Sequence, residues 1–296
     1  MNIKKGSLFI IVAAVLWALD GVVRRSLYSL PPLVIVSVEH IVGSLLLLPF
    51  IFKLIKKERF KKQEWVMLVL ISLFSGLLGT LWFTTALLMT SYISFSVVFL
   101  IQKLQPLFAL LAARILLKEK LSKEYAFWAT SALMAAFFVT FPTGSVNLNT
   151  GDKTLQAALF ALGAAAVWGS STALSRLVLL KHNDKVVTGM RFFITSLLSI
   201  AALIIFGQLP LIRTIAFPQL LQFVFIAVST GMIALLLYYK GLKTTPVHVS
   251  TLLELVFPLL AVGIDIYVYK TEIALVQIIA GATLLFCLYQ VTKKQP

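Results

Sequence analysis

Four ionisable residues stand in the middle of long apolar stretches of this chain: Glu39, Lys103, Arg191 and Glu254. If these stretches cross a bilayer, each ionised side chain costs about 2.5–3.5 kcal/mol or more unless it is paired or hydrated. Such residues therefore mark candidate sites for polar solutes or protons. Because both signs of charge occur, the set suits the carboxylate and ammonium of a zwitterion, and Glu39 and Glu254 are candidates for proton coupling.

The same residue types also have structural interpretations. Glu39 and Arg191 could form a buried ion pair that fixes helix packing, and Lys103 could extend to the membrane surface or pair with a glutamate. Asp20 and Arg24 are four residues apart, which favours an ion pair on one helix face near the outer surface. Both interpretations stay open from the sequence alone.

Polar residues precede two prolines at matching distances. Gln102 and Lys103 come just before Pro106, and Glu254 stands four residues before Pro258. Proline removes a backbone donor and can free a carbonyl for a ligand. We expect the helices broken at Pro106 and Pro258 to flex as gates.

Aromatic residues could provide a stacking platform for a ring or a cation. The candidates are Trp17, Trp82, Trp168 and Tyr239, and the hydroxyl of Ser171 could line the same space. The alternative is packing between helices or anchoring at the membrane interface. Together with the charged groups and Gln102, these residues form the expected substrate site.

The composition indicates which elements must hold these residues. Of the 296 residues, 60% are hydrophobic and only 12% are charged, whereas soluble domains have about 45–50% and about 25%. This excludes an ordinary soluble enzyme, a nucleic-acid-binding domain and a disordered protein. It predicts an all-α integral membrane protein. Apolar runs indicate ten transmembrane helices, at roughly 7–28, 32–54, 65–88, 92–117, 124–141, 154–180, 185–206, 218–240, 246–269 and 272–291.

The distribution of basic residues predicts the topology. The net charge is +15, and 19 of the lysines and arginines fall on the side of both termini against 5 on the other side. Cytoplasmic loops carry such an excess, so both termini are expected in the cytoplasm, with the chain in an inner or plasma membrane. The expected partners are the lipid bilayer and a small-molecule substrate, without nucleic acid.

An internal repeat divides the chain into two halves. Landmark residues recur 151 or 152 positions apart, which predicts units at 1–150 and 151–296. Each half would hold five spans, an odd number, so the second half would be inverted in the membrane. The matching pairs are Trp17 and Trp168, Glu39 and Arg191, Gly79 and Gly231, and Pro106 and Pro258.

These landmarks resemble the ten-helix, EamA-type branch of the drug/metabolite transporter superfamily. The resemblance rests on the Trp17…Gly21 and Trp168-Gly169 openings and on the segments 105–121 and 257–273, where a proline precedes a Glu-hydrophobic ending. In the second copy the acidic position is shifted by one residue. The family's arginine in the second helix of a half matches Arg191, whereas the first half has Glu39 there.

The resemblance implies secondary transport by alternating access, with export of small polar organic solutes, amino acids or related metabolites first. The alternatives are a multidrug or organic-cation exporter and a non-transporting membrane protein. Protons are a candidate coupling ion. No P-loop, HExxH, GxSxG, CxxC or metal-ligand spacing occurs in the sequence, so we expect no enzymatic activity, no cofactor and no metal.

Overall fold

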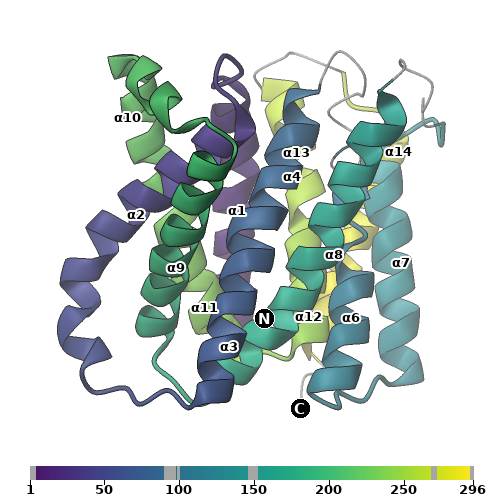
Figure 1. Ribbon diagram of the computed structural model, residues 1–296. Coiled ribbons are helices and arrows are strands. Elements are labelled where there is room, and N and C mark those ends of the chain that lie inside the picture. Colours follow the sequence, from purple (N-terminus) through teal and green to yellow (C-terminus); the bar gives the residue numbers. More distant parts are fainter. Residues whose placement is uncertain (1–4, 90–97, 99–100, 146–152, 268–271, 294–296) are drawn as a thin grey trace.

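The protein is a bundle of helices (Figure 1). The computed structural model describes residues 5–89, 98, 101–145, 153–267 and 272–293. Within these ranges every regular element is a helix and none is a strand, as the composition predicts. Large apolar side chains such as Phe50 and Ile205 are 80% and 77% exposed, which is the pattern of a surface that faces lipid rather than water.

In the described residues, the first half holds three long helical stretches followed, after residue 104, by two more helices. The third stretch is continuous and contains a π-helical segment, η1. The elements are α1 (Lys5–Arg25), α2 (Pro32–Ile55), α3 (Lys62–Ile71), η1 (Ser72–Gly79), α4 (Thr80–Leu88), α6 (Gln105–Leu116) and α7 (Lys123–Thr140).

The second half repeats this order. Its third stretch again contains a π-helical segment, η3, and a 3₁₀ turn, η4, interrupts the next helix before Pro258. The elements are α8 (Thr154–Leu179), α9 (Asp184–Ile205), η2 (Leu209–Thr214), α10 (Phe217–Phe225), η3 (Ile226–Ile233), α11 (Ala234–Thr244), α12 (Val247–Leu253), η4 (Glu254–Val256), α13 (Phe257–Tyr267) and α14 (Leu275–Lys293).

Several of these helices can cross a membrane. Among the described residues, six helical stretches are long and apolar enough by length and composition, and two shorter apolar helices accompany them, Gln105–Leu116 and Val247–Leu260. The chain is therefore a membrane protein with several apolar helices, while the count of ten spans stays a prediction. The six stretches are Pro32–Ile55, Lys62–Leu88, Thr154–Leu179, Asp184–Ile205, Phe217–Thr244 and Leu275–Lys293.

Helices of the two halves pack against one another rather than within separate units. Helix α1 lies along α11, α2 along α9, α6 along α8, and α7 along α14. Close approach at glycine helps this packing: a Cβ at Gly43 of α2 would lie 2.5 Å from the Phe192 ring of α9. The space between the halves is therefore lined by both.

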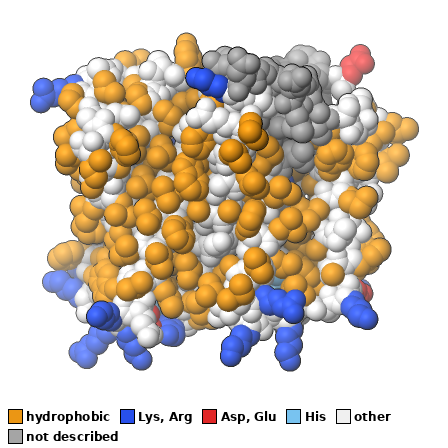
Figure 2. Space-filling view, turned by 45° about the vertical axis from the view of Figure 1, so that its right-hand side comes forward, with side chains coloured by type: hydrophobic (Ala, Val, Ile, Leu, Met, Phe, Trp, Pro, Cys, Tyr) orange, Lys and Arg blue, Asp and Glu red, His pale blue; other side chains and the backbone are white. Residues whose placement is uncertain are grey.

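Helix ends bring a basic surface to one end of the bundle. Figure 2 shows apolar side chains over the body of the molecule and lysine and arginine side chains gathered along its lower edge. We call this the basic end and define it by the turn between α2 and α3, where Lys56, Lys57, Arg59 and Lys61 are clustered. The turns between α6 and α7 and between α8 and α9 lie at the same end (Figure 1).

Two sets of contacts join the halves at the basic end. The first, the His182 clamp, joins the α2–α3 turn to the α8–α9 turn. The imidazole of His182 lies with Nδ1 2.7 Å from Glu58 Oε2 and Nε2 3.1 Å from Glu64 Oε2. The backbone N–H of Asn183 donates to Glu58 Oε1 over 3.0 Å, and Lys181 Nζ lies 3.1 Å from Glu64 Oε1. Glutamates of the first half thus hold a histidine of the second.

The second set, the Glu119 clamp, joins the α6–α7 turn to the start of α12. Glu119 accepts hydrogen bonds from the backbone N–H groups of Val247 and His248 (3.0 and 3.3 Å), and its Oε2 lies 2.5 Å from Nδ1 of His248. Arg176 Nε is 3.7 Å from Oε1. Burial alone would raise the pKa of Glu119, but the bonds from His248 and Val247 outweigh it and hold that pKa below its ordinary value.

Candidate functional site

A cavity of about 160 Å³ lies between the two halves. Residues of α1, α2, η1, α4, α8, α9, η3 and α11 line it, together with residues around the breaks before α6 and α13. Nine of the ten residues expected from the sequence to bind substrate lie on this cavity: Trp17, Glu39, Gln102, Lys103, Trp168, Ser171, Arg191, Tyr239 and Glu254.

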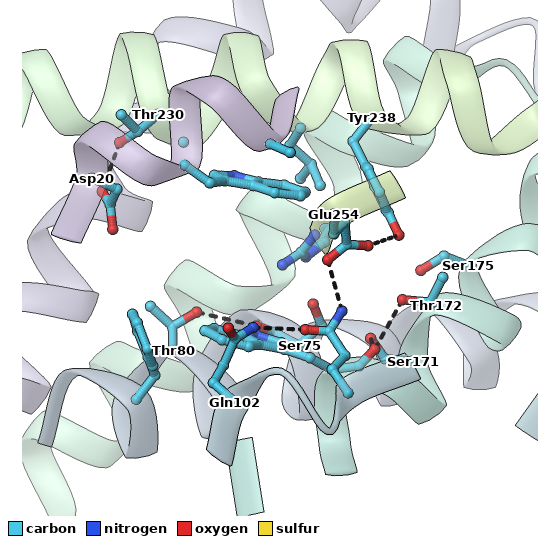
Figure 3. Close-up of a pocket in the computed structure, with 18 of the residues that line it drawn as sticks. Asp20, Ser75, Thr80, Gln102, Ser171, Thr172, Ser175, Thr230, Tyr238 and Glu254 are labelled. Carbon is cyan, nitrogen blue, oxygen red and sulfur yellow. Dashed lines mark hydrogen bonds between the residues drawn. The ribbon is translucent and has the colours of Figure 1, made fainter. Parts of the chain in front are cut away.

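A chain of hydrogen bonds crosses the cavity from one half to the other. Gln102 Nε2 donates to Gln105 Oε1 over 2.9 Å, and Gln105 Nε2 donates to Glu254 Oε2 over 3.0 Å. Tyr238 donates its hydroxyl to the other carboxylate oxygen of Glu254 over 2.6 Å. Figure 3 shows Glu254 between Tyr238 and the side that carries Gln102. We call this set the amide chain. The broken helices position it, since Gln105 opens α6 and Glu254 opens η4.

Lys103 contacts a ring rather than an acid. Its ammonium nitrogen lies 4.0 Å from the centroid of the Phe257 ring, which is a cation–π geometry. In the described part of the chain no carboxylate lies within 4.0 Å of this nitrogen. The alternative in which Lys103 pairs with a glutamate is therefore not observed among the described residues, where Glu254 accepts hydrogen bonds from Tyr238 and Gln105.

A buried ion triad occupies another wall of the cavity. Arg24 Nε is 2.7 Å from Asp20 Oδ2, and Arg24 Nη2 is 2.8 Å from Glu39 Oε2. Thr230 donates to Asp20 Oδ1 over 2.7 Å from the second half. The i,i+4 pair expected on α1 thus exists, but it lines the cavity instead of the outer surface, with Arg24 only 3% exposed. Of the two interpretations open for Glu39 and Arg191, the buried ion pair is not observed among the described residues, where Glu39 pairs with Arg24 instead.

Arg191 is held loosely by comparison. Its Nη1 lies 3.4 Å from the hydroxyl of Tyr239, and its guanidinium carbon lies 5.8 Å from that ring's centroid. The Tyr239 hydroxyl is also 3.0 Å from Ser175 Oγ. Nε of Arg191 is buried and has no hydrogen-bond partner among the described residues. The guanidinium therefore retains unused donor capacity in the cavity wall.

Two pairs of aromatic rings flank the polar groups, each with one ring from each half. Trp17 and Tyr238 have ring centroids 4.9 Å apart, and Phe83 and Trp168 have centroids 5.1 Å apart. Trp168 Nε1 donates to the carbonyl of Ser75 over 3.0 Å. Ser75 belongs to η1, so the π-helical segment helps to fix the orientation of this indole.

The remaining predicted residues lie as follows. Trp82 does not line the cavity, because its ring packs against α8, where a Cβ at Gly163 would lie 2.8 Å from it. Ser171 lines the cavity and donates to the carbonyl of Trp168 over 3.4 Å. Pro106 and Pro258 are buried second residues of α6 and α13. The helices break before both prolines, as expected, and their gating role stays a prediction.

Sequence reasoning missed several lining residues, among them Ser75, Phe83 and Thr230. A hydroxyl followed by glycine occurs in the third stretch of each half, at Ser75-Gly76 and Thr230-Gly231, and could have marked two of them. Within the described residues no group of three His, Cys, Asp or Glu side chains is placed to hold a metal ion.

Comparison with known proteins fits this two-part site. The model of the EamA-like transporter family matches the chain twice, at residues 4–141 and 155–292. Both the starts and the ends of these matches are 151 residues apart, which is the offset of the sequence repeat.

Individual relatives cover the chain almost end to end. The riboflavin transporter ImpX of Fusobacterium nucleatum is 33% identical over 301 residues, covering 99% of each chain. An uncharacterized transporter of Clostridium kluyveri is 21% identical over 275 residues, covering 91% of this chain and 87% of its own. One solved crystal structure has the same fold, with a TM-score of 0.78 at 18% identity and 99% coverage of both chains.

Proposed function

Because the chain belongs to the EamA-like transporter family, we propose that it carries riboflavin or a similar planar, polar heteroaromatic solute across its membrane. Family membership makes it a transporter of a small molecule and not an enzyme, so the non-transporting alternative falls away. The observation that carries the proposal is the cavity in which two cross-half aromatic pairs flank an amide chain. The riboflavin transporter that shares 33% of its residues supports it.

The chemistry of the cavity suits such a solute. A flavin ring offers flat faces for stacking, worth about 0.5–1.5 kcal/mol per aromatic pair beyond the area buried. Its carbonyl and N–H edge matches the amide and carboxylate groups of the amide chain. Among the described residues, three cationic and three anionic side chains line the cavity, so their charges balance and the site suits a solute without net charge. They are Arg24, Lys103 and Arg191 against Asp20, Glu39 and Glu254.

The size of the cavity bears on the second candidate, an amino acid. A cavity of about 150 Å³ holds one benzene ring, so a space of about 160 Å³ must widen before it admits a three-ring solute. A zwitterionic amino acid fits that volume more closely and would use groups of both signs, Glu254 and Arg191. We rank it second because the relative matched over 99% of both chains is named for riboflavin.

We propose that transport follows alternating access between two inverted five-span halves, 1–150 and 151–296. The basic end would face the cytoplasm, with both termini. The His182 and Glu119 clamps support this mechanism, because they join the halves at that end and would have to open for release there. The breaks before Pro106 and Pro258 are where each half would flex, and protons would exchange at Glu254.

The test is transport by purified protein in liposomes. The vesicles are loaded with riboflavin, tryptophan, leucine and tetraphenylphosphonium, and the solutes that leave are quantified with and without a pH gradient. We expect selective loss of riboflavin down its concentration gradient, above the loss from protein-free vesicles. Loss of the amino acids alone would move the assignment to the second candidate. Loss of the organic cation alone would overturn both.

A further inference from the structure

We infer that Arg191 recognises the substrate through a pair of adjacent hydrogen-bond acceptors that lie in one plane. The inference rests on the proposed function and deepens it by naming the part of the substrate that is read. Such a pair occurs in a carboxylate and in the ring-nitrogen and carbonyl edge of a flavin, next to N1 and C2.

The two arginines of the cavity differ in what already binds them. Arg24 uses Nε and Nη2 for Asp20 and Glu39 at 2.7–3.2 Å, and Nη1 lies 3.4 Å from the hydroxyl of Thr84. Its donors are taken on every side, so it holds helices together. With the described residues, Arg191 makes one weak hydrogen bond, at 3.4 Å, to Tyr239.

The position of Arg191 is fixed even though its donors are not. The next residue, Phe192, packs against His40 with ring centroids 5.2 Å apart, and Ser196 donates to the carbonyl of His40 over 2.8 Å. These contacts set α9 against α2 and present Arg191 to the cavity. The lack of a hydrogen-bond partner for Nε among the described residues therefore does not come from a loosely packed helix.

The shape of the guanidinium defines the ligand chemistry. Its planar fork donates two parallel hydrogen bonds to two acceptors in one plane, which the point charge of a lysine cannot do. Buried hydrogen bonds to a charged donor are stronger than neutral ones. A substrate with an adjacent acceptor pair would fill Nε and the neighbouring Nη, while Tyr239 supports the guanidinium from one side.

The experiment measures binding to the purified full chain by wild type, Arg191→Gln, Arg191→Lys and the control Arg213→Gln, which removes an exposed arginine far along the chain. The probes are riboflavin, 2-thioriboflavin, tryptophan and tryptamine. The second and fourth lack one or both acceptors of the pair. We expect Arg191→Gln and Arg191→Lys to weaken binding of riboflavin or tryptophan by about 10- to 100-fold, with Arg213→Gln within about twofold of wild type.

The paired probes separate this inference from the proposed function. In wild type the complete acceptor pair should bind more tightly than its depleted partner, and Arg191→Gln should abolish that preference. Tryptophan binding that depends on Arg191, without riboflavin binding, refutes the flavin assignment and keeps the inference. Riboflavin binding that is unchanged in Arg191→Gln keeps the flavin assignment and refutes the inference. Failure of wild type to bind either refutes both.

Discussion

Glu254 has both carboxylate oxygens occupied, one by Tyr238 and one by Gln105. An ionised carboxylate only accepts hydrogen bonds, whereas a protonated one carries a donor of its own. Proton uptake would therefore change how Glu254 bonds to Tyr238 and Gln105. Because Gln105 belongs to the first half and Glu254 to the second, protonation would affect a hydrogen bond that joins the two halves.

Replacing Glu254 by Gln tests this role. We expect Glu254→Gln to keep riboflavin exchange between vesicle interior and medium but to lose accumulation driven by a pH gradient, because the amide cannot take up the proton. Fluorescence of riboflavin in liposomes measures both rates. Glu272→Gln, at an exposed position, is the matched control. A Glu254→Gln protein with the pH dependence of wild type would remove Glu254 from coupling.

Stacking by Trp17 is tested at the same scale. Trp17→Ala removes one ring of the pair with Tyr238 and should weaken riboflavin binding by about tenfold, whereas Trp17→Phe keeps a ring and most of the affinity. Quenching of flavin fluorescence gives the dissociation constants. Phe50→Ala, which removes an aromatic side chain that is 80% exposed, should leave them unchanged. Equal affinities in Trp17→Ala and wild type would contradict stacking at this position.

The sequence predicted which residues lie near the middle of a membrane span, but not toward which neighbouring helix or cavity each side chain points. Mid-span position and residue type placed Trp17, Lys103 and Arg191 on the cavity, yet the same criteria chose Trp82, which faces α8 instead. The pairing of Glu39 with Arg24 was also missed. Spacing along one helix shows which side chains share a face, and only the packing between helices decides what that face meets.

Among the elements, the π-helical segments allow one helix both to line the cavity and to contact a helix of the other half. Such segments are rare and are concentrated at functional sites, and here η1 and η3 occupy the same place in each half. In η1 the backbone carbonyl of Ser75 receives the Trp168 indole. In η3 the hydroxyl of Thr230 reaches Asp20. Each segment thus contacts the other half.

Gly79, at the end of η1, is where this segment approaches Trp168 of the other half. A Cβ added there would lie 2.5 Å from Nε1 of Trp168, so Gly79→Ala should lower the free energy of unfolding by about 1–3 kcal/mol. It should also weaken substrate binding, because the indole must shift. Thermal unfolding in detergent reads the first effect and flavin binding the second.

The control for this substitution is Gly263→Ala in α13, where an added Cβ meets nothing within 4 Å. Alanine is a better helix former than glycine, so this change should be neutral or slightly stabilising. If Gly79→Ala unfolds at the same temperature as Gly263→Ala, the close approach of η1 to Trp168 does not matter for stability.

The helix breaks could be foreseen from the sequence, whereas the π-helical segments could not. Proline lacks the N–H that an unbroken helix needs, so Pro106 and Pro258 identified both interruptions. A π-helical segment adds one residue to a turn and has no comparable residue signature. Its position depends on what the freed carbonyl meets in three dimensions.

For the molecule as a whole, the two clamps make the basic end the more strongly joined end among the described residues. Opposite it, α10 meets the α1–α2 turn through neutral bonds, from Gln219 to Ser29 and from Gln222 to Ser26. Charged hydrogen bonds contribute more than neutral ones. Among the described residues, charged contacts therefore join the two halves at the basic end, and neutral ones join α10 to the α1–α2 turn.

Acid should loosen the Glu119 clamp. Hydrogen bonds hold the folded pKa of Glu119 below its ordinary value of 4.5. Its ionised form thus stabilises the fold above about pH 4.5, and this contribution is lost as pH falls through the lower folded pKa. Glu119→Gln should unfold at a lower temperature than wild type at pH 7, and this difference should shrink on acidification below pH 4.5. Glu272→Gln serves as the control; a constant difference across pH would contradict the sign.

Opening of the basic end can be followed with one reporter cysteine. Ser171→Cys places a thiol on the cavity wall in a Cys287→Ala background, because Cys287 is the chain's single cysteine. A membrane-impermeant maleimide added at the basic end should label it slowly, and at least several-fold faster when His182→Ala and Glu119→Gln release both clamps. Labelling from the opposite side is the internal control. Equal rates with and without the clamps would show that they do not gate the cavity.

The sequence predicted a helical membrane protein with two related halves, but not the clamps that join these halves at the basic end. Composition gave helices in a membrane, and a repeat of scarce residues gave two related halves, matched at the same offset by the family model. The clamps join turns more than 100 positions apart, such as Glu58 to His182 and Glu119 to His248. No periodicity links such positions, since their meeting depends on how the two halves pack.

The pairing of α1 with α11, α2 with α9, α6 with α8 and α7 with α14 has a consequence for how the protein is made. During synthesis the first half enters the membrane with Gln105 and Trp17 lacking the partners that Glu254 and Tyr238 later supply. We therefore expect the first half to be accessible to proteases and chaperones until the second half has been translated. Either half expressed alone should be degraded, and both expressed together as separate chains should recover each other.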